Sequence, residues 1–293
     1  MPIRKKLFPF ESKWIDIAGN RIHYVDEGHG NTILFCHPSI ATSFMYRHLI
    51  RLLSPTHRCI ALDFPGFGLS TAIKGYTYSI QSQADIMTEF IEKLDLNDLY
   101  PVVQEIGGHA AIIALLPTPH KIKGVIITDT ILFPVSEYKK ISTMLEFING
   151  SFFNFFNKRF NLLIRASYRF GIRNRKLSKD ERQFYKNVFD TMEKRRLITH
   201  MLYQLKNEES LMRRIKNGFE VTLNKKPALL IYGSKDPVHE LGISKRIKNM
   251  LPFSELHLIE GEAHIPHEGA PDEMARLISN WIVDQKHYKN TVT

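Results

Sequence analysis

The stretch Val103-Gln104-Glu105-Ile106-Gly107-Gly108 decides the fold, because it joins a short apolar run to a helical segment through a sharp turn. Tyr100–Gln104 before it has the pattern of a buried strand, and Gly107–Leu116 after it has the pattern of a helix. Small residues just after such a turn let the helix pack close to the strand, and one side chain is lifted above the sheet, as in the G-x-S-x-G turn. Here the lifted residue is Glu105. Because Val103 and Glu105 replace the Gly and Ser of that pattern, the turn alone also fits a structural, salt-bridged Glu.

Strand and helix patterns alternate on both sides of this turn. Trp14–Ala18 and Arg21–Val25 predict a hairpin around Gly19-Asn20. Further strands are predicted at Thr32–Cys36, Arg58–Leu62, Lys123–Thr128, Pro227–Tyr232 and Ser254–Ile259, and helices at Phe44–Leu53, Ile80–Leu94, Ile243–Met250 and Pro271–Val283. Alternation of this kind predicts an α/β fold with a mostly parallel central sheet flanked by helices.

The alternation stops near Phe133. Residues 134–220 are helical in pattern and rich in Phe and Arg, with Ser178 as a predicted N-cap before Lys179–Val188. Strands then resume at Pro227, so the block is inserted between two strands of one sheet. We therefore expect a core domain made of residues 1–133 and 221–293, with residues 134–220 forming a helical cap.

Composition limits the class of protein. The chain has 293 residues, 43% of them hydrophobic, which suits one large domain with an insertion. We expect no secretory signal and no membrane span, because the N-terminus lacks an apolar core and no run reaches about 18 apolar residues. Cys36 and Cys59 lie inside predicted strands, so we interpret them as buried free thiols of a reducing, cytoplasmic protein.

The net charge of +10 is concentrated between Lys158 and Arg196. A basic surface of this kind suits nucleic acid or an acidic membrane. No nucleic-acid motif accompanies the charge, so we interpret it as the solvated face of a basic helical insertion and expect no nucleic-acid partner.

Two further loops follow predicted strands and carry chemistry. Gly261-Glu262-Ala263-His264 places a His after the last strand, and Asp236 follows the strand that ends at Tyr232. Ligands in open α/β sheets bind beyond the carboxyl ends of the strands, so these loops meet the Glu105 turn. The chain order nucleophile, acid, His is that of α/β-hydrolases. The three loops together predict a catalytic triad of Glu105, Asp236 and His264.

The loop Cys36-His37-Pro38-Ser39 lies beside the predicted triad, where backbone N–H groups help to form an oxyanion hole. The nearby Gly-rich turn Asp63–Ser70 lacks the third Gly of a dinucleotide pattern and the Lys of a P-loop, so it predicts packing rather than phosphate binding. His264 and His267 lack the Cys or carboxylate grouping of a metal site. We therefore expect neither a metal nor another cofactor.

Four segments carry a resemblance to a known family. They are Phe8–Ser12 (FPFES), His23–Gly28 (HYVDEG), Ala61–Ala72 (ALDFPGFGLSTA) and Val102–Gly108 (VVQEIGG). They resemble the haloalkane dehalogenase family of α/β-hydrolases, from about residue 8 to about residue 285, cap included. The resemblance implies an α/β-hydrolase fold in which a carboxylate attacks an alkyl carbon and displaces halide, and a His activates water to hydrolyse the ester. It implies that Glu105 is the nucleophile, His264 the base and Asp236 the acid.

The sequence departs from the family's pattern at the proposed leaving-group site, which comprises Pro38, Ser39 and Ile106. The nucleophile is Glu, one methylene longer than the usual Asp. The Trp that usually follows it, and donates its N–H to halide, is Ile106, and the usual halide-binding Asn is Ser39. A further position that often carries Trp is Ile131. Ile has no side-chain donor, so we expect weaker stabilisation of halide.

The sequence leaves three functions open. The first is a haloalkane dehalogenase- or epoxide hydrolase-like enzyme acting on a small apolar substrate. The second is a catalytically impaired or repurposed member that binds a small apolar ligand under the cap, and the third is acyl-ester hydrolysis with water activated directly. The epoxide reaction needs tyrosine donors from the cap, for which the candidates are Tyr138, Tyr168, Tyr185 and Tyr203. Monomer and homodimer both remain open.

Overall fold

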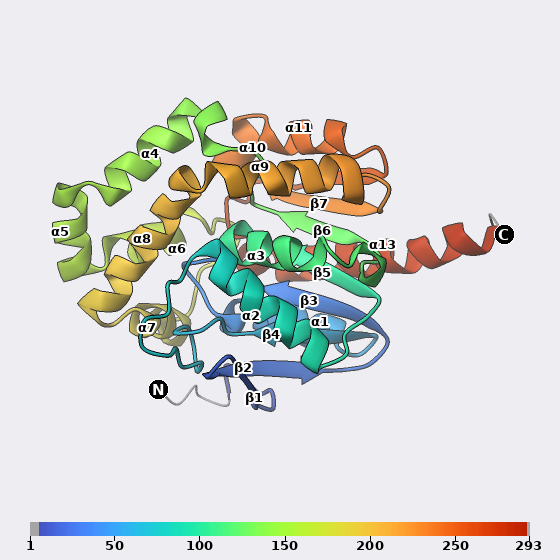
Figure 1. Ribbon diagram of the computed structural model, residues 1–293, viewed down its shortest axis with the longest axis horizontal. Coiled ribbons are helices and arrows are strands. Elements are labelled where there is room, and N and C mark those ends of the chain that lie inside the picture. The colour runs from blue at the N-terminus through green and yellow to red at the C-terminus, as the bar shows by residue number, and fades with distance from the viewer. Residues whose placement is uncertain (1–5, 292–293) are drawn as a thin grey trace.

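The computed structural model describes residues 6–291, with side chains described through residue 285 (Figure 1). The first residues, in which we expect no secretory signal, lie outside this range. The described strands form one eight-stranded sheet in the order β1-β2-β4-β3-β5-β6-β7-β8. Their bounds are β1 Lys13–Ile17, β2 Asn20–Glu27, β3 Asn31–Cys36, β4 His57–Leu62, β5 Leu99–Val103, β6 Val125–Thr128, β7 Ala228–Gly233 and β8 Ser254–Ile259. β2 runs antiparallel to β1 and β4, and the remaining pairs are parallel, so the prediction of a mostly parallel sheet is confirmed.

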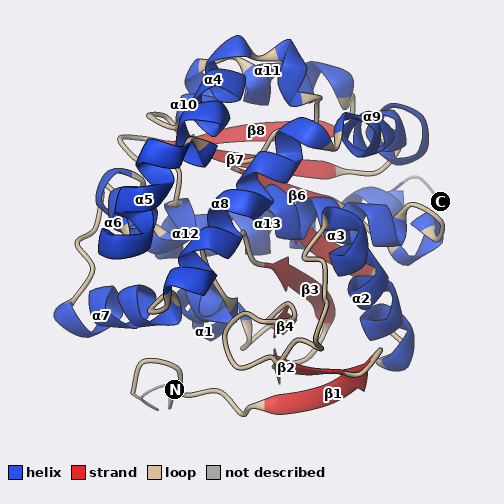
Figure 2. Cartoon of the chain, turned by 60° about the vertical axis from the view of Figure 1, so that its left-hand side comes forward, coloured by secondary structure: helices blue, strands red, loops and turns tan. Residues whose placement is uncertain are grey.

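Helices cover both faces of the sheet, as Figures 1 and 2 show. The core helices are α1 Arg47–Leu53, α2 Ile80–Lys93, α3 Glu105–Leu115, α10 Pro237–Glu240, α11 Ile243–Met250, α12 Pro266–Gly269 and α13 Pro271–Thr291. α1 packs on α13 and α2 packs on α3. Every residue of β5 is buried, as expected of a central parallel strand. No helix among the described residues is long and apolar enough to cross a membrane.

The first hairpin turns one residue earlier than predicted. Its two loop residues are Ala18 and Gly19, with φ of +46° and +78°, and Ile17 pairs with Asn20. Asn20 lies inside β2, where its side chain makes two hydrogen bonds. The amide donates to the Ile17 carbonyl at 3.1 Å and accepts from the Ile73 N–H at 2.9 Å. The Asn thus stabilises the turn from a buried strand position.

The segment between β6 and β7 contains six α-helices. They are α4 Lys139–Asn149, α5 Ser151–Phe160, α6 Leu162–Phe170, α7 Lys179–Val188, α8 Met192–Asn207 and α9 Glu209–Asn217. α7 begins with a capping box, in which Ser178 accepts from the Glu181 N–H while the Glu181 side chain accepts from the Ser178 N–H. α9 packs against α3 of the core. We propose that residues 134–220 act as a cap, with the boundaries predicted from the sequence.

A buried ion-pair cluster joins this segment to the core. Arg47 on α1 donates to Glu268 on α12, with Nη2 and Oε2 3.0 Å apart, and to Glu181 on α7. Arg175, which precedes α7, pairs with the same two carboxylates. We call Arg47, Arg175, Glu181 and Glu268 the Arg47 cluster. Its members are separated by up to 221 residues in sequence, so it holds distant parts of the chain together.

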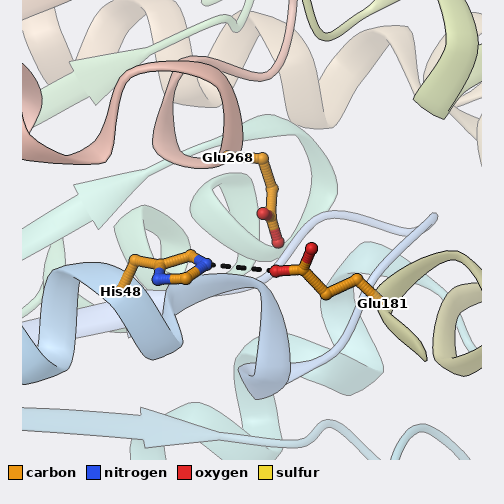
Figure 3. A group of neighbouring side chains, drawn as sticks. All are labelled: His48, Glu181 and Glu268. Carbon is orange, nitrogen blue, oxygen red and sulfur yellow. Dashed lines mark hydrogen bonds and ion pairs between the residues drawn. The ribbon is translucent and has the colours of Figure 1, made fainter. Parts of the chain in front are cut away.

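Figure 3 shows His48 pointing at Glu181 with Glu268 beside them. Donor atoms of these three residues lie within 4.8 Å of one another, a spacing that also suits a metal ion. The guanidinium groups of Arg47 and Arg175 already bind both carboxylates. The negative charge is therefore balanced by arginine, and we interpret the cluster as a structural connection between α7 and the core.

Replacing Arg47 should destabilise the fold strongly. Arg47→Met leaves the carboxylates of Glu181 and Glu268 buried without their main partner, which costs about 3–5 kcal/mol in comparable sites. We expect the free energy of unfolding at neutral pH, measured by urea denaturation, to fall by about that amount. Burial raises the pKa of Glu181, but hydrogen bonds from His48, Ser178 and Arg47 outweigh it and leave the pKa lowered. The difference in unfolding free energy between Arg47→Met and the wild type should therefore be present above the ordinary pKa of Glu. It should shrink as the pH falls through the lowered pKa of Glu181.

Arg58→Met is the matched control. Arg58 binds Asp26 through two hydrogen bonds of 2.8 Å, but about a third of its side chain is exposed. An exposed pair of this kind contributes only about 0–1 kcal/mol. Equal losses in the two variants would contradict a structural role for the Arg47 cluster.

Candidate active site

Glu105 lies at a strained turn between β5 and α3. Its φ is +43°, a left-handed conformation that residues with side chains rarely adopt. The two glycines that follow allow close packing. A Cβ on Gly107 would lie 2.1 Å from the His37 carbonyl oxygen, and one on Gly108 would lie 2.7 Å from the Val103 backbone. The turn therefore has the form predicted from the sequence, with Glu105 raised above the carboxyl ends of the strands.

Glu105, Asp236 and His264 come together in space. His264 Nε2 lies 3.1 Å from Glu105 Oε1, and His264 Nδ1 lies 2.8 Å from Asp236 Oδ1. Asp236 is placed by the backbone, because it is the N-cap of α10 and accepts from the Val238 N–H at 3.0 Å. The sequence prediction had these three side chains meeting at the strand ends, and the geometry matches that arrangement.

The electrostatics of His264 follow from its two carboxylate neighbours. Burial lowers the pKa of His264, but the charge of Asp236 and hydrogen bonds with Asp236 and Glu105 outweigh it and leave the pKa well above its usual value. The two carboxylates thus favour the imidazolium form of His264 in the resting protein. In that state it cannot accept a proton.

Asp129 is a buried acid at this site that the sequence reasoning missed. It follows β6 directly, has a φ of +44° and accepts from the Thr128 hydroxyl at 2.7 Å. Burial and the charge of Asp236 raise the pKa of Asp129 well above its usual value, which favours the neutral carboxyl of Asp129. The only sequence signal was an acid directly after a strand.

Asp129, Asp236 and His264 also place donor atoms within 4.8 Å of one another. This is the second group among the described residues with the spacing of a metal site. Oδ1 of Asp129 and Oδ2 of Asp236 have no other partner among the described residues. The raised pKa of Asp129 favours a protonated carboxyl there, and such a carboxyl can donate a hydrogen bond to a neighbouring acceptor.

The three residues of the proposed leaving-group site differ in what they offer. Pro38 has no N–H, and its carbonyl accepts from His37 Nδ1 at 2.9 Å, so it supplies no donor. Ser39 donates its hydroxyl to Glu105 Oε2 over 3.5 Å. Ile106 lies in the first turn of α3, where backbone N–H groups have no partner within the helix. Ser39 therefore donates to the Glu105 carboxylate, and Ile106 offers a backbone N–H at the start of α3.

A cavity of about 670 Å³ opens beside Glu105. Its core side includes Glu105, Asp129 and His264, and its cap side includes Met144, Phe170 and Leu205. Helices α4, α6 and α8 thus cover the strand ends with mostly apolar side chains. An apolar cavity with a few convergent polar groups is the usual form of a small-molecule site.

The cap tyrosines lie elsewhere. None of the candidate epoxide donors lines this cavity: Tyr138, Tyr168, Tyr185 and Tyr203. The Tyr168 hydroxyl donates to the Ile40 carbonyl at 3.1 Å, and the Tyr185 hydroxyl donates to Glu268. The arrangement therefore gives no support to an epoxide reaction that relies on these tyrosines.

His109 is a second cavity residue missed from the sequence. It lies one helical turn after Glu105, and its Nε2 is 2.7 Å from the carbonyl of Ile131, whose side chain also lines the cavity. Burial lowers the pKa of His109 to about 4, so the ring is neutral and Nε2 carries the proton. His109 Nδ1 is consequently an acceptor, and it has no partner among the described residues.

Comparison with known proteins identifies close relatives. A family model described as the alpha/beta hydrolase fold matches residues 31–271. The chain is 31% identical over 274 residues to haloalkane dehalogenase 2 of Mycobacterium tuberculosis, covering 93% of this chain and 95% of the relative. It is 24% identical to a cis-3-alkyl-4-alkyloxetan-2-one decarboxylase of Shewanella oneidensis, covering 95% of this chain and 90% of that one.

Solved structures give the same fold. The haloalkane dehalogenase DatA from Agrobacterium tumefaciens superposes with a TM-score of 0.82 at 19% identity, covering 97% of this chain and 100% of that one. The haloalkane dehalogenase DbeA from Bradyrhizobium elkani superposes with a TM-score of 0.82 at 20% identity, covering 95% and 99%. The family match over most of the sequence and the identity to haloalkane dehalogenase 2 show that the chain belongs to the α/β-hydrolase fold family, as a haloalkane dehalogenase-like hydrolase.

Proposed function

We propose that the protein hydrolyses a small apolar alkyl halide through a covalent ester on Glu105, with His264 as base and Asp236 as acid. The observation that carries the proposal is the position of the Glu105 carboxylate, 3.1 Å from His264 Nε2 and at the wall of an apolar cavity. Carboxylate nucleophiles act on carbon electrophiles rather than on carboxylic esters. The name of the 31%-identical relative, haloalkane dehalogenase 2, supports the halide class.

The first step uses the freer oxygen of Glu105. Oε1 is bound to His264, whereas the one hydrogen bond of Oε2 within the described part of the chain is the 3.5 Å contact with the Ser39 hydroxyl. Oε2 forms a bond to the alkyl carbon while the carbon–halogen bond breaks and its electron pair leaves with the halide. The Ser39 hydroxyl and the backbone N–H at the start of α3 are the donors available to the anion.

The second step depends on a fall in the pKa of His264. Glu105 contributes to the raised pKa of His264. The ester is uncharged, so this contribution is lost once the alkyl group is attached, and the pKa of His264 falls. The neutral imidazole then takes a proton from water, whose oxygen attacks the ester carbonyl, and the alcohol leaves with a proton. The products are the alcohol, a proton and the regenerated carboxylate.

One observation favours a second function, binding of an apolar ligand without turnover. Glu105 and His264 already satisfy each other as an ion pair, and the side chains of Ile106 and Ile131 offer no donor to a leaving group. A repurposed member would keep this pair as structure and use the cavity for binding alone. Covalent chemistry on Glu105 separates the two functions.

His264→Gln should trap the ester. The variant lacks the base, and loss of general base catalysis slows the second step by about 10²–10⁴-fold while the first step continues. After incubation with a panel of alkyl bromides and chlorides, we expect intact-protein mass spectrometry to show one added alkyl group. Peptide mapping should place it on Glu105. If no member of the panel modifies the variant, the covalent route is wrong.

A matched pair of glutamate variants controls this experiment. Glu240 lines the same cavity as Glu105. In the His264→Gln background, Glu105→Gln should abolish the adduct, and Glu240→Gln should retain it. An adduct that survives Glu105→Gln would assign the nucleophile to another residue.

Replacing Asp236 should lower the pKa of His264. Without the Asp236 charge, the lowering by burial is opposed only by Glu105, so Asp236→Asn should move the pKa of His264 downward. Asp129→Asn should leave the pKa of His264 raised, because the raised pKa of Asp129 favours its uncharged form. The measurement is an imidazole ¹H–¹⁵N NMR titration of each variant. If the pKa of His264 stays raised in Asp236→Asn and falls in Asp129→Asn, then Asp129, rather than Asp236, is the acid that raises it.

The raised pKa of His264 also predicts how the stability of the fold depends on pH. The folded pKa of His264 lies above the unfolded value of 6.5, so the imidazolium stabilises the fold fully below that pH. This contribution is lost as the pH rises through the raised folded pKa. The stability difference between wild type and Asp236→Asn, from urea denaturation, should therefore be largest below pH 6.5 and shrink in alkaline solution. A difference that instead grows with pH would contradict this assignment.

A further inference from the structure

Three consecutive cap helices expose large apolar side chains to solvent. α4, α5 and α6 form the edge of the molecule opposite the C-terminus, and α5 contacts both of its neighbours (Figures 1 and 2). Phe152 and Phe155, one turn apart on α5, are 76% and 70% exposed. We call the exposed residues of these helices the aromatic face; they are Met144, Phe147, Phe152, Phe155, Phe160, Leu162 and Phe170. Isolated exposed apolar residues are ordinary, but a run of seven on adjacent helices indicates an interaction surface.

Positive charge accompanies the aromatic face. Residues 139–176 contain nine Lys or Arg and one acidic residue, Glu146. Glu146 is itself paired with Lys206. Two arginines lie over rings of the face: the guanidinium of Arg159 is 5.9 Å from the Phe160 ring, and that of Arg169 is 5.9 Å from the Phe170 ring. Apolar insertion and positive charge therefore occur on the same helices.

A cationic groove borders this face between α6 and α7. It has a volume of about 670 Å³, with Ile164 and Ile172 in its wall. Seven of its lining residues are basic, and Arg175 among them is paired with Glu181 and Glu268; the seven are Arg165, Arg169, Arg173, Arg175, Lys176, Arg182 and Lys186. Among the described residues, no salt bridge to a carboxylate involves Arg165 or Arg169. Phe170 lines both the groove and the face, so the two features are continuous.

We propose that the aromatic face and the groove together bind the surface of an anionic lipid bilayer. Helices with aromatic residues on one side and Lys or Arg beside them lie in the plane of a membrane, with the apolar side chains among the acyl chains and the cations at the headgroups. A second copy of the chain would bring like charge onto like charge, since the net charge is +10. A nucleic acid would use the cations and stack on aromatic rings, but it would leave the aliphatic Met144 and Leu162 in water.

The active-site cavity opens beside this surface. Met144 and Phe170 belong to the aromatic face and also line the cavity that holds Glu105. An apolar molecule dissolved in the bilayer would reach Glu105 past these two residues without crossing water. This consequence rests on the proposed function, whereas binding to the bilayer does not.

Vesicle sedimentation tests the proposal. The full-length protein is mixed with vesicles of phosphatidylcholine alone or of phosphatidylcholine with phosphatidylglycerol, at low and high salt. We expect binding to the anionic vesicles only, weakening as salt rises. Phe152→Ser with Phe155→Ser should lower the partition coefficient about tenfold, because two exposed rings no longer insert. Arg165→Gln with Arg169→Gln should lower it about fivefold for each charge removed.

Matched controls lie outside these helices. Phe253 is 63% exposed, and Lys225 and Lys245 are exposed. Phe253→Ser, and Lys225→Gln with Lys245→Gln, should bind anionic vesicles like the wild type. All variants are first checked by circular dichroism and thermal unfolding, so a lost fold is not read as lost binding. Glu105→Gln should also bind normally, which separates failure of the docking proposal from failure of the proposed chemistry.

Several results would overturn the proposal. The proposal is wrong if the wild type sediments with neither vesicle type. It is also wrong if the control variants lose as much binding as the variants of the aromatic face. RNA binding without vesicle binding would assign the surface to nucleic acid. A dimer in light scattering that Phe152→Ser with Phe155→Ser dissociates, again without vesicle binding, would assign the surface to a second copy of the chain.

Discussion

The imidazolium of His264 between the carboxylates of Asp236 and Glu105 is the interaction on which the site depends. Its three side chains follow three different strands, β5, β7 and β8, so its geometry exists only when the sheet has formed in the correct order. Two residues at the site, Glu105 and Asp129, have positive φ and therefore a strained backbone. The turn also packs closely against the loop after β3, because a Cβ on Gly107 would lie 2.1 Å from the His37 carbonyl oxygen.

The extra methylene of Glu105 has a direct consequence for the proposed chemistry. Glu105 Oε1 reaches His264 Nε2 at 3.1 Å, a direct hydrogen bond that leaves no room for a water molecule between the two atoms. Ester hydrolysis needs a water at that place. In the proposed reaction, alkylation removes the charge of Glu105 and weakens its attraction to His264, and the second step requires the two side chains to separate and admit water. The proposed nucleophile and the proposed base are therefore in direct contact in the resting protein.

The sequence predicted the sheet and the meeting of Glu105, Asp236 and His264, because both depend on local patterns: an apolar run followed by glycines, and polar residues just after strands. It could not predict what depends on contacts across the chain. Asp129 gains its role only by facing Asp236, and Arg47 gains its role from Glu181 and Glu268, which lie 134 and 221 residues away. The first turn was misplaced by one residue, because Asn20 is common in turns but is used here as a buried strand residue.

The exposure of cap side chains in the structure changes the interpretation of the cap surface. Its Phe-rich helices were read from the sequence as a solvated, basic insertion. A helix that only closes a cavity needs one apolar stripe, yet α4 and α6 have apolar residues on the cavity side and more on the outside. α5 contributes none of the cavity lining but exposes Phe152 and Phe155. Packing within this chain does not explain why Phe152 and Phe155 are exposed. Solvation explains only the exposed charges of the cap. A partner that is apolar within and anionic at its surface accounts for both.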